Sequence, residues 1–198
     1  QPQPLACFLS FIKLNLKPTK LKTMNIGIVC YPTFGGSGVV ATELGMALAD
    51  KGHEVHFITY NQPVRLDFIS HNLHFHEVAL EEYPLFQYQP YELALSTKMV
   101  EVVERYQLEV LHVHYAIPHA YAAYMAKKML EDKGIKVKVV TTLHGTDITL
   151  VGSHPSYKTA VEFSINQSDE VTTVSSSLKE DTLRLFNIQK DIKVVYNF

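Results

Sequence analysis

The sequence predicts an α/β protein with a doubly wound, mainly parallel, Rossmann-like sheet. From Met24 onward, short apolar runs rich in β-branched residues alternate with longer stretches of helical periodicity. Parallel strands need crossover connections, and helices of this length supply them. Of the 198 residues, 46% are hydrophobic and 19% are charged, so the chain can form a core without a disulfide or a metal.

The expected elements follow one another in a regular βα order. Strands are predicted at residues 25–31, 54–60, 73–78, 109–114, 136–143, 169–174 and 191–196. Helices are predicted at residues 38–51, 91–106, 118–133, 156–167 and 175–186. Gly52 suits a helix C-terminus, Pro118 suits a first helical turn, and the serines at 175–177 can cap the last helix. Residues 81–90 and 144–155 are expected to be surface loops.

The first 23 residues differ from the rest of the chain. The sequence begins with Gln1, and residues 5–12 resemble a weak signal-peptide core that lacks a preceding basic segment and a cleavage pattern. We therefore expect Met24 to be the natural start and residues 1–23 to be a non-native or flexible extension. Residues 24–198 are expected to form one domain.

Charge and cysteine content argue against several classes of protein. The formal net charge is −2 and no long Lys/Arg run occurs, which disfavours a nucleic-acid partner. No apolar stretch reaches the roughly 18 residues of a membrane span. Cys7 and Cys30 suggest neither a disulfide framework nor a zinc site, so we expect a reducing, cytoplasmic setting.

A glycine-rich turn at residues 35–38 joins the first strand to the first helix. Such a turn presents free backbone N–H groups and the positive end of a helix dipole, which favour an anion. Residues 36–41 match the dinucleotide fingerprint G-x-G-x-x-G/A, but no acidic residue ends the second strand to bind a ribose. The anion could be a phosphate or a carboxylate, and a purely structural role for the glycines stays open.

The segment T-T-L-H-G-T-D at residues 141–147 ends a strand in polar side chains at the edge where ligands bind. One interpretation is a turn in which Gly145 takes an unusual backbone angle and Asp147 caps the next turn. The other is that Thr142 and His144 hydrogen-bond a polar ligand while Asp147 orients a neighbouring group.

Two histidine pairs, at residues 74 and 76 and at residues 112 and 114, each lie on one face of a strand. No nearby Asp or Cys completes a tetrahedral metal site beside the second pair. We therefore favour hydrogen-bonded interior histidines there over metal ligands.

Six segments together closely resemble one enzyme family. They are C-Y-P-T-F-G-G-S-G-V-V-A-T-E-L-G at 30–45, E-V-H-F-I-T at 54–59, L-H-V-H-Y-A-I-P-H-A at 111–120, T-T-L-H-G-T-D-I-T at 141–149, S-D-E-V-T-T-V-S at 168–175 and V-V-Y-N-F at 194–198. This set is similar to the N-terminal domain of the retaining glycosyltransferases of the GT-B fold, in particular the malate-directed members of bacillithiol biosynthesis. The similarity covers residues 24–198.

The resemblance implies transfer of N-acetylglucosamine from UDP-N-acetylglucosamine to the hydroxyl of L-malate, with retained anomeric configuration and without a metal or other cofactor. In the family, the N-terminal domain holds the acceptor and a C-terminal domain holds the nucleotide sugar. Retention is explained there by front-face attack, in which the departing phosphate helps to remove the acceptor proton. A homodimer is suggested by the family and by the aromatic loop at residues 83–91.

The family's site residues can be carried over to matching positions. The implied substrate-binding residues are Gly36, Ser37, Tyr115, Thr142, His144 and Asn197. Gly36 would face the diphosphate and Ser37 a malate carboxylate or the diphosphate, while the others would line or close the acceptor pocket. His144 and Asp147 are the catalytic candidates, with His144 as a protonated partner for a carboxylate and Asp147 as support for the sugar-binding loop.

The family chain continues into a second domain beyond the position of Phe198. The residues that hold the donor lie there, so we expect the 198-residue chain to be inactive or nearly so by itself. Two other interpretations stay open at this point: a nicotinamide-dependent oxidoreductase domain and a non-catalytic carboxylate-binding domain.

Overall fold

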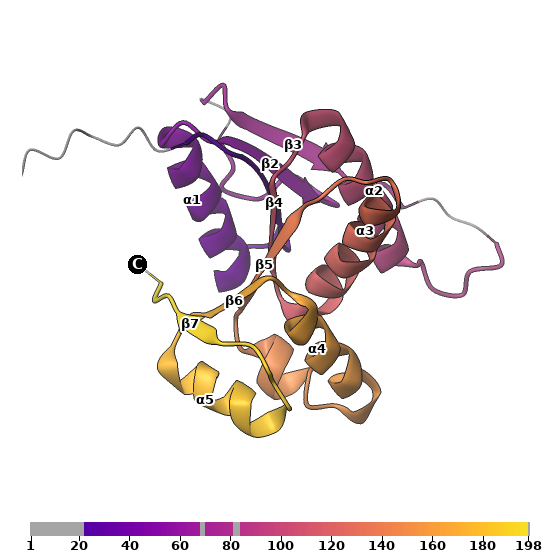
Figure 1. Ribbon diagram of the computed structural model, residues 1–198, viewed down its shortest axis with the longest axis vertical. Coiled ribbons are helices and arrows are strands. Elements are labelled where there is room, and N and C mark those ends of the chain that lie inside the picture. Colours follow the sequence, from indigo (N-terminus) through magenta and orange to yellow (C-terminus); the bar gives the residue numbers. More distant parts are fainter. Residues whose placement is uncertain (1–21, 68–69, 81–83, 198) are drawn as a thin grey trace, which may run out of the picture.

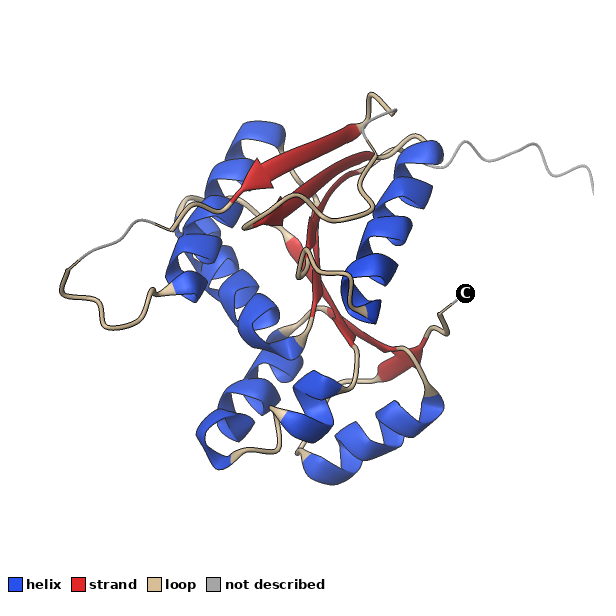
Figure 2. Ribbon diagram, turned by 180° about the vertical axis from the view of Figure 1, so that it is seen from behind, coloured by secondary structure: helices blue, strands red, loops and turns tan. Residues whose placement is uncertain are grey.

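Seven parallel strands form a single twisted sheet in a computed structural model that describes residues 22–67, 70–80 and 84–197 (Figures 1 and 2). The strands are β1 (Asn25–Val29), β2 (Glu54–Thr59), β3 (Leu73–Glu77), β4 (Val110–His114), β5 (Lys138–Leu143), β6 (Glu170–Thr173) and β7 (Ile192–Val194). Their order across the sheet is β3-β2-β1-β4-β5-β6-β7, and every neighbouring pair is parallel. The predicted fold class is confirmed.

Within the described residues, five helices and two short helical turns connect the strands. They are α1 (Gly36–Asp50), α2 (Tyr91–Tyr106), η2 (Ala116–Ala120), α3 (Tyr121–Asp132), η3 (Thr146–Leu150), α4 (Pro155–Gln167) and α5 (Ser176–Leu185). α1 lies on one face of the sheet, and α2, α3, α4 and α5 lie on the other (Figures 1 and 2). The connecting helices therefore switch from one face of the sheet to the other between β1 and β4, which are neighbours in the sheet.

Strand alternation decides which side chains meet each helix layer. On β1 and β2, Ile28 and Phe57 pack under α1. On β4, Leu111 and Val113 join the core below α2 and α3. Because successive side chains point to opposite faces, His112 and His114 lie on the face that carries α1.

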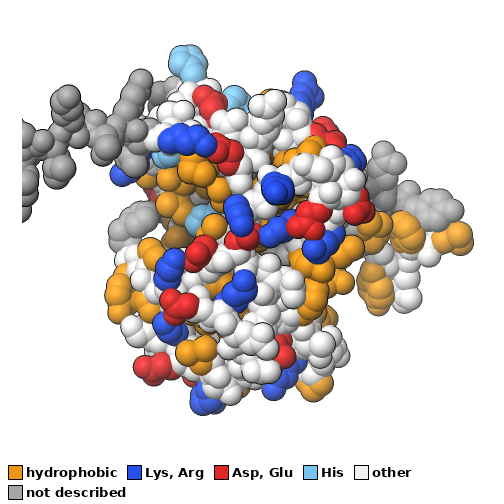
Figure 3. Space-filling model, in the orientation of Figure 1, with side chains coloured by type: hydrophobic (Ala, Val, Ile, Leu, Met, Phe, Trp, Pro, Cys, Tyr) orange, Lys and Arg blue, Asp and Glu red, His pale blue; other side chains and the backbone are white. Residues whose placement is uncertain are grey.

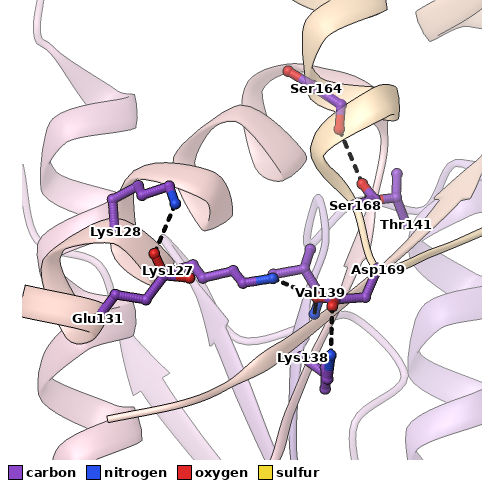
Figure 4. Close-up of polar contacts among 9 residues, drawn as sticks. All are labelled: Lys127, Lys128, Glu131, Lys138, Val139, Thr141, Ser164, Ser168 and Asp169. Atoms are coloured by element: carbon purple, nitrogen blue, oxygen red, sulfur yellow. Dashed lines mark hydrogen bonds and ion pairs between the residues drawn. The ribbon is translucent and has the colours of Figure 1, made fainter. Parts of the chain in front are cut away.

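The carboxylate of Asp169, directly before β6, joins three elements at the edge of the sheet where the strands begin (Figure 4). It accepts from Nζ of Lys127 at 2.7 Å, from Nζ of Lys138 at 2.8 Å and from N of Val139 at 2.9 Å. Burial alone would raise the pKa of Asp169, but these three hydrogen bonds outweigh burial and hold its pKa at about 2. Asp169 thus ties α3 and β5 to β6.

Most element boundaries agree with the sequence-based prediction. Gly52 has φ 88° after α1, and the hydroxyl of Ser175 caps α5 by accepting from N of Leu178 at 3.2 Å. Residues 84–90 have no regular structure, whereas residues 81–83 of the same predicted loop lie outside the described residues. Of the expected N-terminal extension, residues 1–21 also lie outside them.

Two boundary predictions were wrong. The helix expected from Pro118 begins at Tyr121, because Ile117 before the proline is extended and Pro118 belongs to the separate turn η2. The loop expected at 144–155 contains η3, whose N–H groups at residues 148 and 149 both donate to O of Gly145. A five-residue turn is too short to give a periodic signal.

Candidate functional site

Among the described residues, the backbone donors in the first turn of α1 have no hydrogen-bond partners. The residue before the helix is Gly35, which has no side chain to cap it, and the first bonded N–H is that of Val39, which donates to O of Gly35 at 3.2 Å. The N–H groups of residues 36–38 therefore stay open to a ligand. A Cβ on Gly36 would meet nothing within 4 Å, so the space in front of this turn is free.

Gly38 permits the close approach that creates this turn. A Cβ at Gly38 would lie 2.5 Å from O of Tyr31 and 2.6 Å from O of Thr33. Both contacts are with backbone, which cannot move aside as a side chain can. The glycine therefore serves strand–helix packing, while the neighbouring Gly36 and Ser37 face the open space.

A cavity of about 460 Å³ lies in front of the α1 turn, at the carboxyl ends of the strands. Its lining residues come from the β1–α1 turn, the end of β4, the β5–η3 turn and the segments after β6 and β7, and they are Tyr31, Thr33, Gly35, Gly36, Ser37, Tyr115, His144, Thr146, Val174 and Asn197. We call this space the anion cavity. Open α/β sheets bind ligands at such a position, where the connections leave for opposite faces.

The structure brings five of the predicted site residues into the anion cavity: Gly36, Ser37, Tyr115, His144 and Asn197. Ser37 and His144 are half-buried, and Asn197 is exposed. No charged side chain is among the lining residues in the part of the chain that the structure describes. An anion there would be held by neutral donors and by the helix dipole.

Tyr115 is held in an unusual backbone conformation at the end of β4, with φ 87°. Its hydroxyl accepts from Oγ1 of Thr146 at 3.2 Å, which leaves the phenolic proton free to be donated. The Tyr115 ring also contacts the Tyr31 ring edge-on, with the ring centroids 5.4 Å apart. Its centroid is likewise 5.4 Å from that of the His144 ring. Tyr115 is therefore oriented from two sides.

Asp147 lies beneath the site with its carboxylate committed to backbone donors. Oδ1 accepts from N of His144 at 3.1 Å and from N of Gly145 at 2.9 Å, and Oδ2 accepts from N of Ala116 at 3.0 Å. The residue is 2% exposed and does not line the anion cavity. Its contacts are those of a residue that positions the segments after β4 and β5. Burial raises the pKa of Asp147, and these hydrogen bonds oppose that effect.

Thr142, like Asp147, is a predicted site residue that does not line the anion cavity. Its hydroxyl contacts Nε2 of His112 at 2.8 Å and Oγ1 of Thr172 at 2.7 Å, and the residue is 8% exposed. These neighbours on β4 and β6 use its hydrogen-bonding capacity. Thr142 therefore links β4, β5 and β6 next to His144.

The surroundings of His144 disfavour the protonated form that was expected for it. Burial, followed by the nearby His112 and His119, lowers the pKa of His144 to about 4. Burial likewise lowers the pKa of His112 to about 4 and that of His114 well below its usual value. Among the residues that the structure describes, no group of three or more His, Cys, Asp or Glu side chains is placed to hold a metal ion.

A second cavity, of about 550 Å³, adjoins the first and was missed by sequence reasoning. We call it the tyrosine cavity, because its lining includes Tyr31, Tyr91, Tyr115, Tyr121 and Tyr157. It shares Tyr31, Tyr115 and Thr146 with the anion cavity. The residues at 91, 121 and 157 come from three different helices, so no local pattern in the sequence brings them together.

On the face seen in Figure 3, acidic and basic side chains are interspersed without an extended basic patch. No helix within residues 22–67, 70–80 and 84–197 is long and apolar enough to cross a membrane.

Comparison with known proteins decides the family. Residues 34–198 match the sequence profile of Glycosyltransferase Family 4. The chain belongs to this family. It is also 57% identical, over 175 residues, to N-acetyl-alpha-D-glucosaminyl L-malate synthase of Bacillus anthracis; the match covers 88% of this chain and 45% of that protein. This glycosyltransferase chain thus spans just under half the length of that relative.

Solved structures agree with a GT-B fold. A glycosyltransferase from Rickettsia africae matches with a TM-score of 0.65 at 20% identity, covering 89% of this chain and 43% of the other. A lipopolysaccharide outer core galactosyltransferase matches with a TM-score of 0.60 at 16% identity, covering 88% and 46%. The Anabaena protein HepE, solved in complex with UDP, matches with a TM-score of 0.58 at 13% identity, covering 88% and 44%. At these identities the likeness supports the fold alone.

Proposed function

We propose that this domain forms the acceptor side of an enzyme that transfers N-acetylglucosamine from UDP-N-acetylglucosamine to the hydroxyl of L-malate, the reaction that begins bacillithiol biosynthesis. The anion cavity carries the proposal, because it joins a free helix N-terminus to Ser37, Tyr115, His144 and Asn197. The 57% identity to the malate synthase of Bacillus anthracis supports the choice of substrates. The family membership disfavours the nicotinamide-dependent alternative.

The chemistry of the cavity suits one end of a dicarboxylate. Backbone N–H groups at the start of α1 and the hydroxyl of Ser37 would bind a carboxylate, since hydrogen bonds to a charged acceptor are stronger than neutral ones. The phenol of Tyr115 and the imidazole of His144 would orient the remaining polar groups of malate. Catalysis would then consist mainly of positioning the acceptor hydroxyl and stabilising the departing diphosphate, with retention through front-face attack.

The donor is proposed to bind mainly to residues outside this chain. Gly36 would meet the diphosphate from the acceptor side, and a second domain would hold the nucleotide. On this view the 198-residue chain binds malate but releases almost no UDP from UDP-N-acetylglucosamine. Turnover by the purified chain at rates near those of a two-domain family member would contradict this part of the proposal.

Malate binding to the purified chain tests the acceptor proposal. Addition of L-malate should shift the amide signals of Ser37, Tyr115 and His144 in a 1H–15N spectrum, whereas NAD should not. Ser37→Ala should weaken malate binding by about tenfold, the effect of one hydrogen bond to a charged group. Ser156→Ala is the matched control, because Ser156 is likewise the second residue of a helix and lies outside both cavities.

Three outcomes separate the alternatives. Unchanged malate affinity in Ser37→Ala would move the acceptor site elsewhere. Binding of NAD with micromolar affinity would favour an oxidoreductase domain. Malate binding without turnover, even when a donor domain from a family member is supplied, would favour a non-catalytic carboxylate-binding domain.

A further inference from the structure

The imidazole of His114 lies directly behind His144, away from the anion cavity. Nδ1 of His114 is 2.8 Å from Nε2 of His144, and the two ring planes are 27° apart. With ring centroids 5.1 Å apart, so short a nitrogen–nitrogen distance requires the two ring edges to face each other. This is the geometry of an N–H···N hydrogen bond.

That contact uses Nε2 of His144 and leaves its Nδ1 as the nitrogen open to the cavity. No hydrogen-bond partner for Nδ1 of His144 occurs among the described residues, and this atom is not among the buried polar atoms that lack a partner. The role of His144 therefore depends on one question: whether its single proton sits on Nδ1 or on Nε2. The first arrangement presents an N–H donor to a ligand, and the second presents a lone pair.

The surroundings of His114 bear on the answer. Its Nε2 is buried and has no partner within the described part of the chain, and the whole residue is 1% exposed. If His144 donated through Nε2, the proton of His114 would have to sit on this unpartnered atom. If His114 donates through Nδ1, the same atom carries only a lone pair. In proteins, a buried N–H group without a partner is rarer than a buried acceptor without one, so the second arrangement is favoured.

His119 provides an internal precedent in the same part of the core. Its Nδ1 contacts the carbonyl oxygen of His114, which can only accept, so the proton of the neutral His119 ring must sit on Nδ1. Its Nε2 is then a bare lone pair, and this atom too is buried without a partner. The core around β4 thus already holds one imidazole in the form inferred for His114.

We propose that His114 is a positioning residue that donates through Nδ1 to Nε2 of His144 and thereby fixes the proton of His144 on Nδ1. His144 then presents a neutral N–H donor to the anion cavity and is not a proton acceptor there. The conclusion that this donor binds a carboxylate or diphosphate oxygen rests on the proposed function, whereas the proton assignment does not. The ligand class is an oxyanion, in keeping with the other donors that line the cavity.

The proton positions can be measured directly in the ligand-free chain. With 15N-labelled histidine, long-range 1H–15N correlations distinguish the two neutral tautomers and the imidazolium form. We expect His114 and His144 both to carry the proton on Nδ1 at pH 7, with His144→Asn used to assign the signals. A proton on Nε2 of either residue, or an imidazolium signal from His144 at pH 7, would overturn the proposal.

Two substitutions of His114 separate positioning from simple packing. Asn has a side-chain N–H donor close to the place of Nδ1, so His114→Asn should keep the tautomer of His144 and the malate affinity of the parent chain. His114→Leu removes the donor and should release the tautomer and weaken malate binding by about tenfold. His71→Leu, at an exposed histidine outside both cavities, is the control for a histidine-to-leucine change.

The outcomes are distinguishable. If His114→Leu leaves the tautomer of His144 unchanged, His114 does not position it. If His114→Leu fails to fold, the tautomers measured in the parent chain decide the proposal. If the parent chain binds no malate but shows both protons on Nδ1, the proposed function fails while the positioning role of His114 stands.

Discussion

Asp147→Asn is the substitution that most directly tests how the site is held together. Asn keeps the shape of the side chain but replaces one acceptor oxygen with an NH2 group. The amide oxygen can keep the bonds from N of His144 and N of Gly145, which both reach Oδ1. The NH2 group then faces the N–H of Ala116, a residue that is fully buried.

The expected cost follows from these contacts. One hydrogen bond to a charged acceptor is worth about 1.5–3 kcal/mol, and leaving the N–H of Ala116 unpaired costs about 1–3 kcal/mol more. Because burial raises the pKa of Asp147, removal of its charge recovers part of this sum. We expect the free energy of unfolding to fall by about 2–4 kcal/mol, a large share of the usual 5–15 kcal/mol.

Urea unfolding at pH 7, followed by circular dichroism, measures this change. Asp132→Asn is the matched control, because Asp132 is an exposed residue at the end of α3 and should change stability by less than about 0.5 kcal/mol. In the variant, the amide signals of Ala116 and Gly145 should shift more than those of β1. An Asp147→Asn chain as stable as the control would refute the idea that this carboxylate holds the segments after β4 and β5.

Three further predictions concern packing and charge. Gly38→Ala should lower the free energy of unfolding by about 2–3 kcal/mol, because its Cβ would meet two backbone oxygens; equal melting of Gly38→Ala and the exposed Gly36→Ala would contradict this. The pKa of buried His119 is lowered to about 4, so its contribution to stability should be full above pH 6.5 and should fall by up to about 3 kcal/mol as the pH drops to 4, and the other buried histidines should add to this loss; a flat profile from urea melts at several pH values would argue against it. Asp169, with its pKa held at about 2, should contribute stability above pH 3.8 that is lost as the pH falls toward 2, and Asp169→Asn should cost about 1 kcal/mol at pH 7 after allowance for solvent screening, measured against Asp191→Asn on the surface.

The meeting of these residues at the anion cavity was predictable because parallel strands share one carboxyl edge. Residues that follow β1, β4, β5 and β7 must meet at that edge, whatever the details of packing. Ser37, Tyr115, His144 and Asn197 illustrate the rule, since each lies within three residues of the end of a strand or in the first turn of the helix after one. The regular alternation of short apolar runs with helical periodicity sufficed for the fold class.

The bonding state of individual side chains was not predictable. Thr142 looked free in the sequence, but the strand register pairs it with His114 on one side and Thr172 on the other. Its hydroxyl contacts side chains of these neighbouring strands, and no local sequence pattern predicts the strand register. The expected positive charge of His144 is disfavoured for a similar reason, because burial by segments distant in sequence lowers its pKa.

The edge strand β7 has a consequence for how the anion cavity opens. It is three residues long and, in the described structure, pairs with β6 and with no other strand; one backbone bond is added from N of Val195 to O of Thr173 at 2.8 Å. Asn197, two residues further on, is held at the cavity by this short strand and by the adjacent Tyr196, whose hydroxyl lies 2.9 Å from that of Ser176. Local opening of β7 would remove one wall while the other six strands stay paired, so a bound ligand that contacts Asn197 should slow hydrogen exchange at β7 more than at β1.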